Sequence, residues 1–103
     1  MDKFLSLLGI ARRAGKLALG NDPVLEAIRK GEAKLLLAAA DLSPRTKKNI
    51  MAAAEKEEIL LLQTDILMDV FAGAIGKRVG ILSVNDAGFA NKLRQLWDDR
   101  SDK

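Results

Sequence analysis

Residues 73–80 form a glycine-rich segment that also carries two basic side chains, Lys77 and Arg78. A phosphate-binding P-loop requires a glycine five positions before its Gly-Lys pair and a Ser or Thr after the lysine. Here those positions hold Phe71 and Arg78, and the segment precedes an expected strand, which excludes both a P-loop and a dinucleotide-binding turn. The segment is interpreted either as a basic loop whose backbone approaches a large anion, or as an ordinary turn with solvated charges.

A second candidate site is the turn formed by Gly20, Asn21 and Asp22, which leads into an expected helix at Pro23. Unpaired N–H groups at a helix N-terminus can bind a phosphate or read base edges, and the side chains of the turn add further donors and acceptors. The alternative is a simple helix cap followed by proline. Because the carboxylate of Asp22 repels phosphate, base or sugar donors are the expected partners in this turn.

The third pattern is a run of charges in an expected helix over residues 44–57. Basic residues occupy its first turns and acidic residues its last turns: Arg45, Lys47 and Lys48, then Glu55, Glu57 and Glu58. This order opposes the helix macrodipole, at a cost of a few tenths of a kcal/mol per charge. A bound anion near Pro44 would convert the cost into a gain, whereas a solvated face is the simpler interpretation.

Missing residue types exclude most familiar catalysis. The chain has no Cys and no His, which rules out Ser-His-Asp triads, thiol nucleophiles and metal sites built from these residues. We therefore expect no enzymatic activity, cofactor, metal or small-molecule substrate. The aromatic residues Phe4, Phe71, Phe89 and Trp97 all fall at expected core positions, so no stacking platform for single-stranded nucleic acid is predicted.

Length and charge indicate one small domain with an anionic partner. The 103 residues fit a single domain over residues 1–103. Residues 1–50 carry ten Lys or Arg and five Asp or Glu, a net +5, whereas residues 51–103 carry seven and nine, a net −2. The longest uncharged stretch, residues 4–11, is too short for a membrane span and lacks a signal-peptide cleavage site, so a cytoplasmic protein without membrane contact is expected.

Periodicity and turn residues predict alternating helices and strands. Helices are expected over residues 2–14, 23–30, 44–57 and 65–74, with a last helix that Asn85 and Asp86 start; strands over 16–19, 34–40, 59–63 and 79–84; and a frayed end from about 98. Asn21 or Asp22 is expected to cap the second helix, and Thr64 and Asp65 the fourth. The alternation predicts the α/β class: a three-layer α/β/α sandwich around a central mixed, largely parallel sheet of about four buried strands.

Several short motifs, in their order and spacing, resemble the kink-turn-binding ribosomal L7Ae family, and more closely its short bacterial YlxQ-like members. The motifs are residues 11–17, Gly20, Ala27 and Ile28 with Gly31, residues 33–35, residues 74–77 and residues 86–93. The resemblance covers about residues 5–96. It implies a three-layer fold and a non-enzymatic, RNA-binding role near the ribosome.

The resemblance also implies where RNA would bind. In the family, the RNA surface is formed by the turn entering the second helix and by the loop before the last strand, which correspond to Gly20 to Pro23 and Ile75 to Val79. These two segments are therefore expected to lie on one face. Kink-turn binders carry a polar pair in that turn and a lysine further along the helix, where this chain has Asp22, Pro23 and Glu26.

The sequence thus predicts a monomeric protein that binds kinked or bulged structured RNA, with ribosomal RNA as the expected partner. The predicted RNA-binding residues are Gly20, Asn21, Asp22, Ile75, Gly76, Lys77, Arg78 and Val79, with Arg12, Arg13 and Lys16 as secondary phosphate contacts. One alternative is a protein-interaction module that has kept the fold and lost kink-turn recognition. Another is a stand-alone relative of the substrate-binding domain fused to some RNA methyltransferases.

Overall fold

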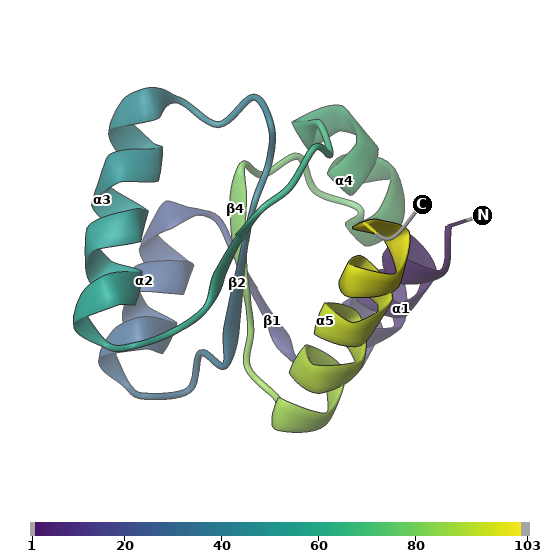
Figure 1. The fold of residues 1–103 in the computed structure, drawn as a ribbon, viewed down its shortest axis with the longest axis horizontal. Coiled ribbons are helices and arrows are strands. Elements are labelled where there is room, and N and C mark those ends of the chain that lie inside the picture. The colour runs from purple at the N-terminus through teal and green to yellow at the C-terminus, as the bar shows by residue number, and fades with distance from the viewer. Residues whose placement is uncertain (1, 102–103) are drawn as a thin grey trace.

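The structure is a computed structural model that describes residues 2–101 (Figure 1). Helices and strands follow one another along the chain as α1 (Lys3–Arg13), β1 (Leu17–Leu19), α2 (Asn21–Arg29), β2 (Leu35–Ala38), α3 (Pro44–Lys56), β3 (Leu61–Gln63), α4 (Met68–Ile75), β4 (Ile81–Val84) and α5 (Ala87–Ser101). All of the predicted helices and strands are present. The α/β class is confirmed.

The four strands form one mixed sheet in the order β1-β4-β2-β3. Strand β4 runs antiparallel to both β1 and β2, and the β2–β3 pair is parallel. The expectation of a largely parallel sheet is therefore wrong. Helices α2 and α3 each carry the chain back across the sheet, so β1, β2 and β3 all begin at the same end. The segment containing α4 does not cross back, so β4 begins at the end where β3 finishes. Strand β4 consequently enters between β1 and β2 in the opposite direction.

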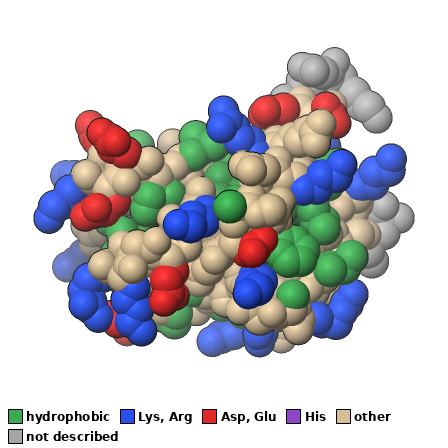
Figure 2. Space-filling model, turned by 90° about the horizontal axis from the view of Figure 1, so that it is seen from below, with side chains coloured by type: hydrophobic (Ala, Val, Ile, Leu, Met, Phe, Trp, Pro, Cys, Tyr) green, Lys and Arg blue, Asp and Glu red, His purple; other side chains and the backbone are tan. Residues whose placement is uncertain are grey.

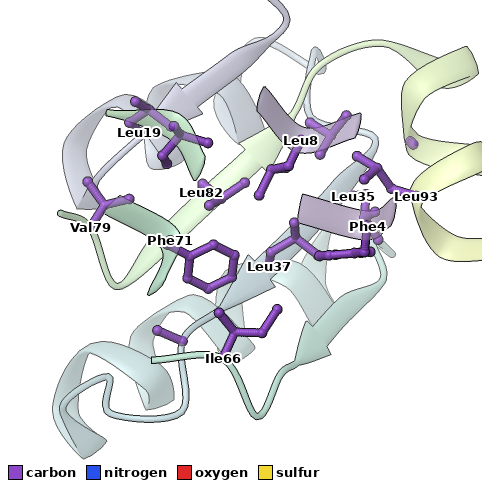
Figure 3. Close-up of a cluster of buried hydrophobic side chains, with 14 residues drawn as sticks. Phe4, Leu8, Leu19, Leu35, Leu37, Ile66, Phe71, Val79, Leu82 and Leu93 are labelled. Atoms are coloured by element: carbon purple, nitrogen blue, oxygen red, sulfur yellow. The ribbon is translucent and has the colours of Figure 1, made fainter. Parts of the chain in front are cut away.

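Helices cover both faces of the sheet, as predicted for a three-layer sandwich. Figure 1 shows α2 and α3 on one side of the strands, and α1, α4 and α5 on the other. Alternate residues of β2 divide between two buried clusters, because successive side chains of a strand point to opposite faces. Leu35 and Leu37 join the cluster under α1, α4 and α5, which is drawn in Figure 3, and Leu36 and Ala38 join the cluster under α2 and α3.

The caps predicted for α2 and α4 are both wrong. Gly20 is the N-cap of α2, so Asn21 and Asp22 lie inside the first turn and no side chain caps the helix. The hydroxyl of Thr64 donates to Ala38 O at 2.7 Å and accepts from Ile66 N at 3.2 Å, and Thr64 therefore anchors β3 to β2.

The edge of the sheet and the end of the chain also differ from expectation. Strand β3 lies at an edge and is half-buried or exposed along its length, whereas a buried strand was predicted. Helix α5 continues to Ser101 instead of fraying from about residue 98, and residues 102 and 103 lie outside the described part. Arg100 explains this extension, because it pairs with Asp2 and holds the end of α5 against α1.

Candidate nucleic-acid interface

Three loops meet at one end of the sheet. The N–H of Gly20 donates to Ile81 O at 3.0 Å, which joins the end of β1 to the start of β4. The N–H of Ala39 donates to Gly80 O at 2.8 Å, which joins the end of β2 to the same strand. We call residues 20–22, 39–43 and 76–80 the three-loop end; it lies at the top of Figure 1. The turn before α2 and the loop before β4 therefore lie together, as the sequence predicted.

The turn at Gly20 exposes backbone donors. Gly20 has φ +93° and ψ 168°, a conformation that L side chains rarely adopt, so this position requires glycine. Its carbonyl accepts from Val24 N at 3.1 Å and closes the first turn of α2. The N–H groups of Asn21 and Asp22 have no intrahelical partner and no side-chain cap within residues 2–101. Both residues are exposed, so these two donors are open to a ligand.

The basic loop after α4 is shaped by Gly76, which ends the helix in the left-handed conformation at φ +80°. Lys77 and Arg78 follow and are exposed. By contrast, Ile75 and Val79 are only 5% and 6% exposed. Their side chains anchor the loop in the core, so these two predicted site residues are available to RNA through their backbone alone.

The two cations of this loop are not equivalent. Arg78 Nε lies 2.7 Å from Asp69 Oδ1, and Arg78 Nη1 lies 3.5 Å from Met68 Sδ. The Asp69 carboxylate raises the pKa of Arg78, with a smaller contribution from Asp41. Lys77 has no ion pair among residues 2–101. Lys77 is therefore the more available phosphate ligand.

The third loop was not among the predicted site residues, although it completes this surface. A Cβ placed on Gly80 would lie 2.6 Å from Leu42 Cδ1, so the absence of a side chain there lets residues 39–43 pack against the start of β4. Asp41 Oδ1 accepts from Met68 N at 2.9 Å and thereby holds the start of α4. Ser43, two positions further on, is the N-cap of α3.

Glu26 departs from the family pattern, but neighbouring cations compensate its charge. Arg29 donates to both carboxylate oxygens, with Arg29 Nε 3.1 Å from Glu26 Oε2, and Lys30 Nζ lies 3.6 Å from Oε1. The hydrogen bond from Arg29 lowers the pKa of Glu26, and Glu26 in turn raises the pKa of Arg29. Glu26 therefore remains ionised at neutral pH.

The secondary phosphate candidates are spread more widely. Arg12 and Arg13 form the last turn of α1. A Cβ added to Gly9 would lie 3.0 Å from Ala74 O and 3.9 Å from Arg13 Nη1. The Arg13 guanidinium therefore lies near the last turn of α4. Lys16 lies at the opposite end of β1 from Gly20, where its carbonyl accepts from Asn85 N at 2.8 Å. The three-loop end therefore includes none of these three residues.

The described part of the chain holds neither a cluster of metal ligands nor a membrane-spanning helix. Within residues 2–101, nowhere do three or more His, Cys, Asp or Glu side chains come together as metal ligands. Its helices are all too short or too polar to cross a membrane.

Comparison with known sequences shows the family of this chain. Residues 2–94 match the family model of the ribosomal protein L7Ae/L30e/S12e/Gadd45 family. The chain is 35% identical over 97 residues to the RNA-binding protein YlxQ of Bacillus subtilis strain 168, covering 93% of this chain and 96% of that protein. It is 34% identical over 94 residues to the large ribosomal subunit protein eL30B of Schizosaccharomyces pombe, covering 89% and 80%.

Solved structures show the same fold. A protein of unknown function from Bacillus halodurans C superposes with a TM-score of 0.90 at 33% sequence identity, over 95% of this chain and 99% of that one. The 15.5kD RNA binding protein of Giardia lamblia superposes with a TM-score of 0.73 over 92% of this chain and 82% of that one. Its sequence identity is 16%, so this second likeness concerns the fold alone.

Proposed function

Because the chain belongs to the ribosomal protein L7Ae/L30e/S12e/Gadd45 family, we propose that it binds structured RNA through the three-loop end and catalyses no reaction. The observation that carries this proposal is the hydrogen bond from Gly20 N to Ile81 O, which places the turn before α2 beside the basic loop before β4. Backbone donors and a free ammonium group then face one ligand. The RNA-binding relative YlxQ supports RNA as that ligand.

Each part of the site has a distinct role in this proposal. Gly20 lets the backbone approach closely, Asn21 hydrogen-bonds base or sugar edges, and Lys77 contacts phosphate. Arg78 contributes less, because Asp69 already neutralises it. A kinked or bulged RNA fits this site better than a straight helix, since unstacked bases expose the edges that backbone donors read. The ribosomal relative eL30B makes ribosomal RNA the first candidate.

The test is a binding titration of the purified protein against a kink-turn RNA and a straight RNA duplex of equal length, each at two salt concentrations. Tighter binding to the kinked RNA is expected. Equal affinities for the two RNAs, with a steep salt dependence, would mean that the protein binds RNA only through non-specific phosphate contacts. If the protein bound neither RNA, the proposal that it recognises kinked RNA would be rejected.

The Lys77→Ala variant tests the basic loop within the same titration. It should weaken kink-turn binding and flatten the dependence of log K on log salt by roughly 0.7 to 0.9, the contribution of one phosphate contact. Arg78→Ala should have a smaller effect, because Asp69 compensates its charge. Lys56→Ala, in the last turn of α3, is the matched control. An equal change in the Lys77 and Lys56 variants would remove the loop from the interface.

A specific observation also favours a second candidate, a protein-interaction module. The loop after β2 and the start of α4 bring Asp41 and Asp69 near Arg78, so two negative charges offset the two cations of the basic loop. Such a surface suits a polar protein partner better than a polyanion. Under this alternative, partners captured from a lysate survive nuclease treatment, whereas an RNA binder copurifies with RNA and releases it in salt.

A further inference from the structure

Helix α3 carries basic side chains that do nothing for its own stability. Arg45 and Lys47 lie in its first turn and Lys48 in the second; Arg45 and Lys48 are exposed, and Lys47 is half-buried. Within residues 2–101, none of these three forms an ion pair. Positive charge opposes the macrodipole at this end of a helix, and Arg45 and Lys48 repel each other at the i,i+3 spacing. Folding alone therefore does not explain this cluster.

These turns lie next to the three-loop end. The loop of residues 39–43 leads directly from β2 into α3, and Leu42 packs over Gly80. Ser43 then caps α3 by accepting from Thr46 N at 3.3 Å. Helices α2 and α3 pack together on the same face of the sheet, and Figure 1 shows both starting at the end of the sheet where these loops meet. The basic turns of α3 and the turn at Gly20 therefore lie at the same end of the sheet, on the face that α2 and α3 cover.

The three-loop end lacks the charge that a polyanion requires, and α3 supplies it. Asp41 and Asp69 offset the charges of Lys77 and Arg78, whereas the first turns of α3 carry three positive charges that form no ion pair within residues 2–101. At the opposite end of the molecule, in the view of Figure 2, Lys or Arg side chains alternate with Asp or Glu side chains. The first turn of α3, by contrast, holds no acidic residue.

We propose that Arg45, Lys47 and Lys48 form a second RNA-contacting surface, which binds backbone phosphates of the RNA arm that leaves the three-loop end. This inference rests on the function proposed above. The three-loop end selects the bent shape, and α3 provides the salt-dependent part of the affinity. The basic residues at the start of α3 then lower the stability of the helix slightly but contribute to RNA binding.

The test compares two triple variants of equal charge change. One is Arg45→Ala, Lys47→Ala, Lys48→Ala; the control is Lys3→Ala, Lys92→Ala, Arg94→Ala, on the exposed surfaces of α1 and α5 across the sheet. Both are titrated with the kink-turn RNA over a series of salt concentrations. The α3 variant should lose roughly tenfold in affinity at low salt and about two units of the salt slope, and the control much less. Its thermal midpoint should equal or exceed that of the unmodified protein, because the removed charges opposed the helix dipole.

The outcomes separate this inference from the proposed function. If the unmodified protein binds the RNA but the two triple variants change its binding equally, α3 is not a contact surface and the inference fails alone. An unchanged salt slope in the α3 variant overturns it in the same way. If the unmodified protein does not bind the kink-turn RNA at all, the proposed function fails and the inference fails with it.

Discussion

At the scale of single residues, α2 carries the clearest departure from the family pattern, because Glu26 replaces the expected lysine. Glu26→Lys should strengthen kink-turn binding several-fold and steepen the salt slope by roughly 0.7 to 0.9, as expected for one added phosphate contact. The change also frees Arg29 and Lys30, which now pair with Glu26. The measurement is the same titration, at neutral pH, where the lowered pKa of Glu26 keeps it charged.

Glu26→Gln is the control for this charge reversal. It removes the negative charge and releases the two cations without adding a new one, so its affinity should fall between those of the unmodified protein and Glu26→Lys. Identical binding by all three proteins would place this face of α2 outside the interface and confine recognition to the loops.

At the scale of elements, Asp41 links the loop after β2 to the start of α4. Asp41→Ala removes the acceptor of Met68 N and should lower the free energy of unfolding by about 1 kcal/mol, as for loss of a helix cap. Asp41→Asn keeps an oxygen acceptor and should retain most of this stability while removing a negative charge beside the candidate site. Urea unfolding measures the first effect and RNA titration the second. Equal destabilisation by both substitutions would show that charge, not the hydrogen bond, matters.

The same link shows what could be predicted from sequence and what could not. Helix and strand positions follow from local periodicity and turn residues, so all nine elements were anticipated. The cap of α4 by Asp41, 27 positions away, and the insertion of β4 between β1 and β2 depend on contacts that no local pattern encodes. The family resemblance predicts that the Gly20 turn and the basic loop lie together. It does not predict the packing of Leu42 over Gly80, because an apolar residue before a helix N-cap has no distinctive sequence pattern.

At the scale of the whole molecule, Arg100 joins the two ends of the described chain. Arg100 Nε lies 3.1 Å from Asp2 Oδ2, while Asp2 Oδ1 caps α1 by accepting from Phe4 N at 2.7 Å. The guanidinium also lies 4.8 Å from the centroid of the Trp97 ring, within cation–π distance. One side chain thus holds the C-terminal turn of α5 against the start of α1. This contact lies on the α1/α5 side of the sheet, so it can be removed without altering the loops of the proposed RNA site.

Arg100→Ala should therefore lower stability and leave RNA affinity unchanged. The ion pair is about one-third exposed, so solvent screening limits its contribution, and the total loss should be about 1 kcal/mol. For a domain of this size that loss corresponds to a fall of about 4–8 °C in thermal midpoint. Arg100→Lys keeps the charge without the planar group and should be intermediate, and the exposed Arg94→Ala should be neutral. A matching loss in Arg94→Ala would show that net charge, rather than the link between the chain ends, sets the stability.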